Sequence, residues 1–373
     1  MLNYNISKTP NHTYFDASIC NNDTVGNQRQ IQASVNITRT NPIIDNCEDY
    51  YCSVINFQIS SSSLPLFIPL CQIGQNDPNL LIYQITLTYG GFTQTENVIW
   101  SPVQLNASIP QPPITQQYID NDYYFCYSYQ YFINLINNTF QTCYNNLNTQ
   151  VAGALPTSKA PFIELNLDNY KFILNADELG YDLALTTPIK IYFNAPLFTL
   201  FGSLQAYNYG NLNAPKNFQL LVNNINNSNI YSVGSINYLQ SYGEFSSLPA
   251  WNCVKSIVFS SNKIPVIPEQ ITPSQIFNSE IALGNDIANS CIDSMITDFK
   301  IDLVNGTESK PIIQYSPSTE YRLIDLIGNN PLYGLDLNVY WVDTFNIKHP
   351  YYLNSGEYLS FKMLFRKKSF NGL

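Results

Sequence analysis

The stretch LDLNVYWVDTFNIKHPYYLNSGEYLSFKMLFRKK, from Leu335 to Lys368, is the most informative part of this chain. Its two ends consist of strand-like runs rich in β-branched, aromatic and other apolar residues, and a polar turn segment separates them. The stretch stops at a basic cluster, Arg366, Lys367 and Lys368. It therefore predicts two strands that form a closing hairpin of a β-sandwich.

Strand signals continue outward along the rest of the chain. From Ile31 to Thr38, apolar and polar residues alternate as a half-buried strand requires. Two further alternating runs, Leu80–Tyr89 and Phe92–Trp100, are joined by Gly90 and Gly91, which can adopt the positive φ of a tight turn and so predict a hairpin. Short strands are also predicted at Phe162–Leu174, Ile189–Phe193, Phe218–Val222, Val254–Ser260, Phe299–Val304, Tyr321–Ile327, Leu335–Val342 and Tyr358–Phe365. Such evenly recurring strands favour an all-β sandwich or jelly roll.

Three segments break this pattern. Between residues 123 and 147 the apolar residues recur at the spacing of one helix face, which predicts the longest helix there. The proline-rich stretches Ile109–Pro113 and Ile264–Pro268 are stiff and extended, and each suggests a domain boundary. Residues 1–30 are polar and rich in Asn, which predicts an N-terminal arm.

The composition points to surfaces that become covered. Only 12% of the residues are charged, against roughly 25% in average soluble proteins. The 28 Tyr and 21 Phe residues suit burial against a partner, because aromatic residues are enriched at interfaces. The alternative is that an AT-rich genome sets the Tyr and Asn content.

The charge distribution argues against a general nucleic-acid binder. The formal net charge is −10, whereas duplex binding needs many Lys and Arg side chains. No Lys or Arg lies between Arg39 and Lys159, and the basic residues return late in the chain. The cluster Arg366, Lys367 and Lys368 is therefore a candidate contact for packaged DNA or an acidic neighbour, the alternative being an ordinary solvated terminus.

The start of the chain and its cysteines predict folding in a reducing compartment. The residues after Met1 lack the basic start and apolar core of a secretion signal, and no apolar run is long enough to span a membrane. The eight cysteines contain no C-x-x-C pair, which argues against a thiolate metal site. We expect buried free thiols rather than disulfides.

Residue types needed for common catalytic sites are scarce. His12 and His349 are the only histidines, and His349 is most simply a turn residue, the alternative being a pH-sensing or ligand-binding role. No glycine pattern matches a phosphate loop. Close acidic pairs could act as in glycosidases, but we interpret them as solvated loop residues: Glu48 and Asp49, Asp120 and Asp122, Asp177 and Glu178. The sequence thus predicts no enzyme, no cofactor and no metal.

Several motifs in a shared order resemble one protein family. They are Arg39–Pro42 with Tyr50–Tyr51, Leu64–Phe67, Tyr124–Asn138, Phe193–Asn194 with Leu197–Phe201, and Trp341–Lys367. This order resembles the minor capsid (penton or vertex) proteins of virophages and polinton-like viruses. Each motif is moderately specific by itself, but together they span most of the chain.

The resemblance implies a jelly roll that carries an extra lobe. The expected division is an arm over residues 1–30, the first part of the jelly roll over 31–115, an inserted, mainly β lobe over 116–250 with a helix near 123–147, and the second part over 251–373. It also implies a homopentamer at each vertex of an icosahedral capsid, in contact with double-jelly-roll major capsid proteins. We then expect the protein in the virion, assembled in the host cytoplasm.

Two other kinds of protein remain as alternatives. Exposed aromatic residues also fit a carbohydrate-binding β-module or host-attachment protein, and a carboxylate pair would fit a glycan-cleaving enzyme. The first is compatible with a capsid role, because the inserted lobe could bind a host-surface glycan or receptor.

Overall fold

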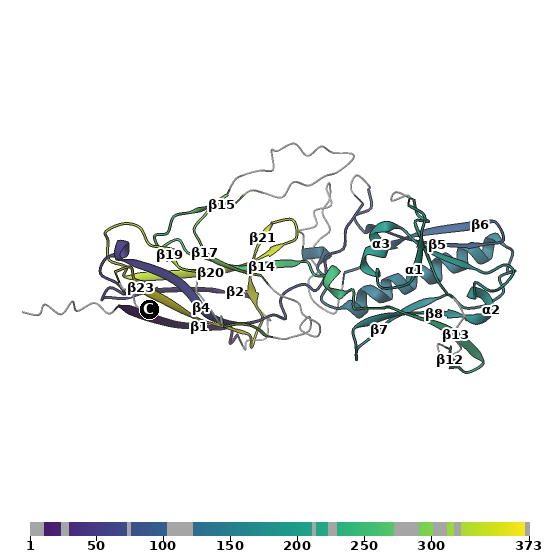
Figure 1. Cartoon of the computed structure of the whole chain (residues 1–373), viewed down its shortest axis with the longest axis horizontal. Coiled ribbons are helices and arrows are strands. Elements are labelled where there is room, and N and C mark those ends of the chain that lie inside the picture. The colour runs from purple at the N-terminus through teal and green to yellow at the C-terminus, as the bar shows by residue number, and fades with distance from the viewer. Residues whose placement is uncertain are drawn as a thin grey trace, which may run out of the picture. The chain divides into compact units, whose positions relative to one another are not determined.

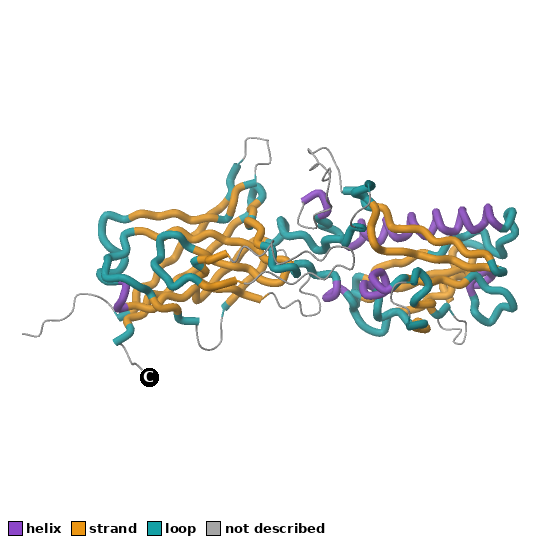
Figure 2. Tube along the Cα trace, turned by 90° about the horizontal axis from the view of Figure 1, so that it is seen from above, coloured by secondary structure: helices purple, strands orange, loops and turns teal. Residues whose placement is uncertain are grey.

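The computed structural model describes residues 11–23, 30–72, 76–102, 122–210, 214–222, 230–271, 291–300, 312–316 and 322–369, with the backbone alone at 269–271 and 291–293. These residues form two compact units. The first unit contains the described residues up to Leu64 and from Val254 onward, and the second contains those from Pro65 to Cys253. Figure 1 labels their helices and strands, and Figure 2 shows that strands provide most of the regular structure.

The first unit is a jelly-roll sandwich of two antiparallel sheets. One sheet has the order β1 (His12–Cys20), β23 (Tyr358–Lys367), β4 (Tyr50–Ser60) and β18 (Ile312–Tyr315), and β19 (Ile324–Asp325) also pairs with β4. The other has the order β17 (Met295–Lys300), β14 (Val254–Ser260), β20 (Gly334–Asp343) and β21 (Lys348–Pro350), and β3 (Ser34–Thr38) also pairs with β20. Smaller pairs are β2 (Ile31–Gln32) with β22 (Tyr352–Leu353) and β15 (Glu269–Ile271) with β16 (Cys291–Asp293).

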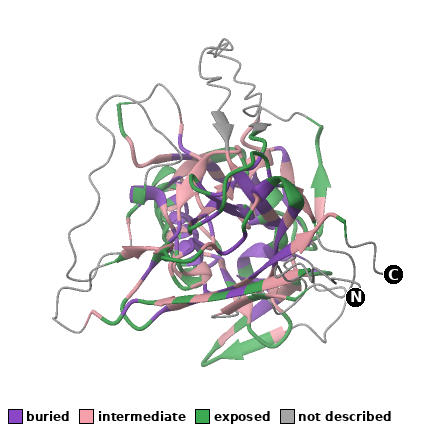
Figure 3. Ribbon diagram, turned by 90° about the vertical axis from the view of Figure 1, so that its left-hand side faces the viewer, coloured by how far each residue is buried: buried purple, intermediate pink, exposed green. Residues whose placement is uncertain are grey.

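Aromatic side chains join the two sheets of the first unit. Phe57 on β4 lies 5.1 Å from Phe259 on β14 and 4.7 Å from Phe299 on β17, measured between ring centroids. Phe361 on β23 also contacts Phe259. Along much of β20 and β23 buried residues alternate with more exposed ones, and Figure 3 shows changes of colour along single strands. The period of two in the sequence is therefore the period of a sheet with one buried face.

The second unit packs α1 (Tyr129–Gln150) against two antiparallel sheets. One sheet has the order β10 (Ala206–Asn208), β11 (Phe218–Leu220), β9 (Lys190–Phe193), β5 (Leu80–Tyr89) and β6 (Phe92–Ile99). The other has the order β12 (Ile230–Val233), β13 (Ile236–Tyr242), β8 (Lys171–Asp177) and β7 (Phe162–Asn166). The short helices among the described residues are α2 (Glu178–Tyr181), α3 (Ala195–Leu200), and the 3-10 turns η1 (Cys47–Asp49), η2 (Asp122–Tyr124) and η4 (Leu248–Ala250).

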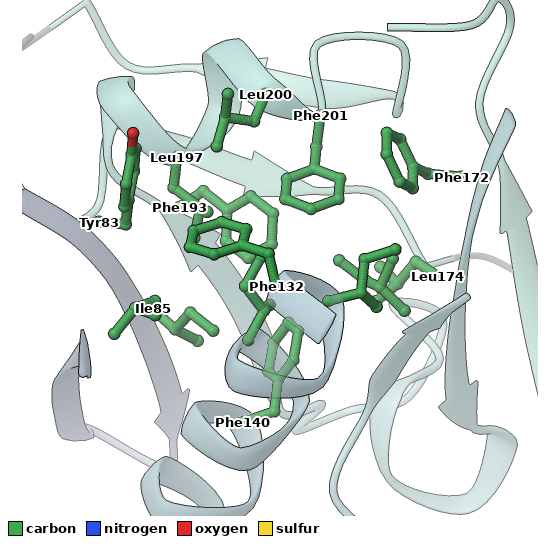
Figure 4. Packing of buried hydrophobic residues seen from close by; sticks show 14 of the residues in the cluster. Tyr83, Ile85, Phe132, Phe140, Phe172, Leu174, Phe193, Leu197, Leu200 and Phe201 are labelled. Carbon is green, nitrogen blue, oxygen red and sulfur yellow. The ribbon is translucent and has the colours of Figure 1, made fainter. Parts of the chain in front are cut away.

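Aromatic rings fill the core of the second unit. Phe132 and Phe140 on α1 point toward Phe193 and Phe201, as Figure 4 shows. Trp251 closes this core and donates a hydrogen bond of 2.8 Å from Nε1 to the Leu200 carbonyl. Apart from Phe125, which precedes the helix, the apolar positions that predicted α1 are positions that it buries.

The predicted fold class and the Gly90–Gly91 hairpin are confirmed. Gly90 and Gly91 have φ of 56° and 92°, and β5 pairs with β6. The predicted helix begins later than residue 123, at Tyr129, because the Ser128 side chain accepts a hydrogen bond from the Tyr131 amide and caps it. The predicted strand Phe299–Val304 is observed as β17 up to Lys300, and its remainder lies outside the described residues.

The closing hairpin predicted for Leu335–Lys368 is wrong. Its two strands, β20 and β23, lie in different sheets of the sandwich, and β20 turns back through β21. β23 pairs instead with β1 and β4, which come from the start of the chain. The chain between β21 and β23 therefore connects one sheet to the other.

The predicted boundaries also differ from the observed units. Part of the predicted arm, residues 12–20, forms β1 and pairs along its length with β23, whereas residues 1–10 lie outside the described part. The first boundary lies between Leu64 and Pro65, not near residue 115. The reason is that the β5–β6 hairpin pairs with β9 and packs on α1, so it belongs to the second unit. The proline-rich stretch near residue 110 is not described.

Candidate functional site

The predicted basic cluster lies at the end of β23. Lys368 Nζ is 2.8 Å from Asp325 Oδ1 and donates a hydrogen bond of 3.3 Å to the Leu326 carbonyl. The same ammonium lies 5.3 Å from the centroid of the Tyr51 ring. Because a carboxylate, a carbonyl and an aromatic ring surround it, Lys368 stabilises the junction of β23, β4 and β19.

The other two members of the cluster do not share one surface. Arg366 is opposite Tyr51 in the sheet register, and Lys367 is opposite Tyr50. Consecutive strand residues point to opposite faces, so Arg366 and Lys367 project in different directions. Farther along β23, Lys362 pairs with Asp16 on β1 at 3.4 Å. Basic residues that are adjacent in the sequence therefore do not form a single basic patch in the fold.

The turn predicted for His349 is wrong, because His349 is the middle residue of strand β21 and lies opposite Trp341 on β20. The His349 ring stacks on Trp341 with a centroid distance of 4.0 Å, and its Nε2 lies 3.1 Å from Asp343 Oδ2. The buried Asp343 also accepts hydrogen bonds from the Phe345 and Ile347 amides through Oδ1. These contacts fix the β20–β21 turn.

The seven thiols whose side chains are described are free, as predicted, and six of them are buried. Cys47, Cys52, Cys71, Cys126, Cys143 and Cys253 are buried, and Cys20 is exposed. Burial raises the pKa of Cys52, Cys71 and Cys143 to about 12, and that of Cys126 to about 11. Since the thiolate is the nucleophile, these four cysteines are unsuited to catalysis. The side chain of Cys291 lies outside the described part.

The interpretation of the acidic pairs as solvated loop residues is wrong for Asp177, which is buried at the end of β8, whereas Glu48 and Asp49 are exposed. Glu48 and Asp49 lie in η1, and the Asp49 carbonyl accepts a hydrogen bond from the Lys368 amide. Asp177 is buried, accepts a hydrogen bond from the Thr157 hydroxyl and caps α2 by accepting from the Leu179 amide. Asp120 is not described. Among the residues whose positions are described, no three His, Cys, Asp or Glu side chains gather so as to hold a metal.

The surface of the second unit carries residues that sequence reasoning did not single out. Exposed aromatic side chains occur on both of its sheets, at Tyr207, Tyr231 and Tyr242, and just after their strands, at Tyr209 and Phe245. On β13, Tyr238, Gln240 and Tyr242 recur every second residue and share one face. This spacing of two residues was the signal in the sequence that the three side chains share a face, but the sequence did not reveal which strands lie beside β13.

No helix in the described part of the chain combines the length and apolar character needed to cross a bilayer. A jelly-roll sandwich with a second unit in the chain between β4 and β14 defines the class: an all-β protein of two units built on a jelly roll. Comparison with known proteins then gives the family. The sequence model of the Sputnik minor capsid protein V18/19 family matches residues 13–367, which is nearly the whole chain. The chain belongs to this family, and it is a minor capsid protein and a component of the virion.

Individual relatives agree with this assignment. The chain is 32% identical to structural protein V19 of the Sputnik virophage over 206 residues, covering 53% of this chain and 90% of that protein. The match to protein V18 of the same virophage is 29% over 123 residues, covering 31% and 74%.

Two solved structures have a similar fold over almost the full length. A chain of the 3.5 Å cryo-EM structure of the Sputnik virophage has a TM-score of 0.84 and 30% identity, covering 98% of this chain and 100% of that one. The mavirus penton protein crystal structure has a TM-score of 0.65 and 18% identity, covering 95% and 99%.

Proposed function

We propose that this chain forms the pentameric vertex of an icosahedral capsid and contacts double-jelly-roll major capsid proteins there. The observation that carries this proposal is the likeness to the mavirus penton protein, which extends over both units and not over the jelly roll alone. The role is structural and not catalytic. The acidic and thiol groups discussed above are engaged in folding contacts, which supports that reading.

A ring of five copies needs two different, complementary surfaces on each copy, because such interfaces are heterologous. The first unit offers exposed aromatic and aliphatic side chains for them. Tyr14 lies on β1, at the edge of its sheet. Other exposed members are Ile327, Tyr333 and Tyr352. Aromatic residues of this kind are enriched at protein interfaces, so we assign these positions to contacts with neighbouring capsid subunits.

Native mass spectrometry of the whole chain tests this proposal, with and without the major capsid protein encoded beside it. We expect a species of five times 42.4 kDa, alone or induced by that partner. Tyr14→Ser should reduce this species, whereas the matched change Tyr207→Ser, in the second unit, should leave it intact. A chain that stays monomeric under both conditions would contradict the vertex assignment.

We also propose that the end of β23 contacts packaged DNA or an acidic neighbour. The positive charges of Arg366 and Lys367 at the end of β23 support this, and because the two side chains project from opposite faces of the strand, each would meet a partner on its own face. R366A/K367A should lower the DNA content of assembled particles, and Lys362→Ala on the same strand is the control. Unchanged DNA content would overturn this contact.

Host attachment by the second unit is the second candidate function. The exposed Tyr and Phe side chains on its two sheets favour it, since large exposed aromatic residues mark interaction surfaces. Assembly in the host cytoplasm is supported by the free, buried thiols of the described residues, which a reducing compartment maintains.

A further inference from the structure

The sheet β12-β13-β8-β7 has one covered face and one outer face. Its covered face packs on α1, where Asn137 Nδ2 donates to the Ile163 carbonyl at 2.9 Å, and it contributes Ile163, Leu174 and Leu239 to the core. Residues that alternate with these point the other way. We call their surface the outer face. It consists of Tyr231, Tyr238, Asp177, Gln240, Asn175, Phe162, Tyr242, Ile173 and Glu164. Its centre is buried, at Asn175, Asp177, Ile173 and Tyr238, and it is exposed at Tyr231, Tyr242 and Glu164.

A chain of hydrogen bonds crosses the outer face. The Tyr242 hydroxyl donates to Gln240 Oε1 at 2.7 Å, and Gln240 Nε2 donates to Asn175 Oδ1 at 2.8 Å. Asn175 Nδ2 then donates to Glu164 Oε2 at 2.9 Å. The direction of donation is the same in all three hydrogen bonds and runs from Tyr242 to Glu164. One end of this series of hydrogen bonds is therefore the Glu164 carboxylate, and the other is the Tyr242 phenolic oxygen, which has a spare lone pair.

Aromatic rings border this polar chain. Tyr231 and Tyr242 are 48% and 42% exposed. Tyr238 is opposite Tyr231 in the register, and its ring meets Phe162 edge to face at 5.3 Å. Tyr238 and Phe162 are not part of the core that α1 covers. The outer face thus has its own cluster of rings, fixed by neighbouring strands and open at Tyr231 and Tyr242.

The chemistry of the outer face selects a class of ligand. Both ends of the hydrogen-bond chain accept hydrogen bonds, so a matching ligand must supply donors. The ring faces carry negative quadrupole potential and attract weakly positive C–H groups. A sugar ring supplies hydroxyl donors at its edge and C–H groups on its face. The carboxylate of Glu164 repels anionic sugars, so the expected ligand is a saccharide without acidic groups.

We propose that the outer face of β12-β13-β8-β7 is a binding site for neutral saccharides, with Tyr231 and Tyr242 as stacking rings and Glu164 as a hydroxyl acceptor. This proposal rests on host attachment by the second unit and deepens it, whereas the vertex role stands independently. A series of side-chain hydrogen bonds that only stabilised the sheet would not require the exposed rings of Tyr231 and Tyr242. It would also gain nothing from an exposed carboxylate at its end.

The test uses the full chain and an immobilised panel of neutral oligosaccharides built from glucose, galactose, mannose and N-acetylglucosamine, with sialylated counterparts beside them. We expect binding to neutral members above the sugar-free background, and weaker binding to the sialylated forms. Tyr231→Ala and Glu164→Gln should each weaken binding at least tenfold. Tyr207→Ala, an exposed tyrosine on the other sheet of the same unit, is the matched control and should bind like the wild type.

Four outcomes would overturn the proposal. They are absence of binding by the wild-type chain, a preference for sialylated sugars, unchanged binding by Tyr231→Ala and Glu164→Gln, or an equal loss in Tyr207→Ala. Thermal unfolding of each variant checks that the fold is retained. The yield of the five-chain species is measured in parallel. If Tyr231→Ala lowers that yield while no saccharide binds, the outer face is a contact between capsid proteins and not a sugar site.

Discussion

Asp336 lies near the start of β20 and holds the turn that follows β14. Its Oδ1 accepts hydrogen bonds from the Ser261 hydroxyl at 2.6 Å and the Lys263 amide at 2.8 Å, and the Asn262 amide donates at 3.1 Å. Burial alone would raise the pKa of Asp336, but these hydrogen bonds to the ionised carboxylate lower it below the ordinary 3.8. The charged form therefore stabilises the folded state.

We predict that Asp336→Asn lowers the free energy of unfolding by about 1–3 kcal/mol at pH 7, because an amide cannot accept the same set of hydrogen bonds. A depressed folded-state pKa contributes stability above the ordinary value, and this contribution is lost as pH falls through that value toward the folded one. The difference between variant and wild type should thus narrow below about pH 4. Denaturant unfolding at pH 7 and pH 3 measures it.

Asp325→Asn is the control for this experiment. Asp325 pairs with Lys368 but its side chain is more than half exposed, so the change should cost only about 0.2–1 kcal/mol. A cost for Asp336→Asn that is equal at pH 7 and pH 3 would contradict the role assigned to its charge.

The thiols give a second prediction. At pH 8, a thiol with a pKa of about 12 is ionised in only about one molecule in ten thousand, so buried Cys52, Cys71 and Cys143 should resist alkylation in the folded chain. Exposed Cys20 should react first. Peptide mapping after brief iodoacetamide treatment follows each site. Labelling of Cys52 as fast as Cys20 would show that the thiol is more accessible than the structure indicates.

The sequence located the basic residues of β23 but not their partners. Lys368 meets Asp325 because β19 and β23 both pair with β4, and these strands come from distant parts of the chain. Periodicity reports which face of a strand is buried, but it contains no information on which strand lies alongside. The same limit hid the outer face, whose members come from β7, β8, β12 and β13.

Among strands and turns, local signals predicted local structure. The β5–β6 hairpin followed from two alternating runs and a glycine pair, because every contact it needs lies within about twenty residues. β20 and β23 were recognised as strands for the same reason. Their assignment to one hairpin failed because a jelly roll places successive strands in opposite sheets. β1 was missed because the polar, Asn-rich residues around it masked its short alternation of Phe15, Ala17 and Ile19 with Asp16 and Ser18.

The Gly90–Gly91 turn gives a prediction for this element. Both residues have positive φ, a conformation that costs an L-residue roughly 1–2 kcal/mol. Gly91→Ala should therefore lower the free energy of unfolding by about 1 kcal/mol. Gly202→Ala is the control, because Gly202 has an ordinary φ and a methyl group there would meet its nearest atom at 3.5 Å. Equal effects of the two changes on thermal unfolding would contradict the turn assignment.

For the chain as a whole, the family and the architecture agree on a capsid role. The first unit is a jelly roll assembled from both ends of the sequence, and the second unit interrupts it between β4 and β14. Each of the two units therefore offers a surface of its own to other molecules. We propose that the first unit builds the vertex ring and that the second carries the attachment function.

Cryo-electron microscopy of particles co-assembled from this chain and its major capsid protein tests the vertex proposal most directly. The proposal predicts density for five copies of the jelly-roll unit around each five-fold axis, in contact with the surrounding double-jelly-roll proteins. Five-fold positions filled by another protein, with this chain located elsewhere in the shell, would contradict it.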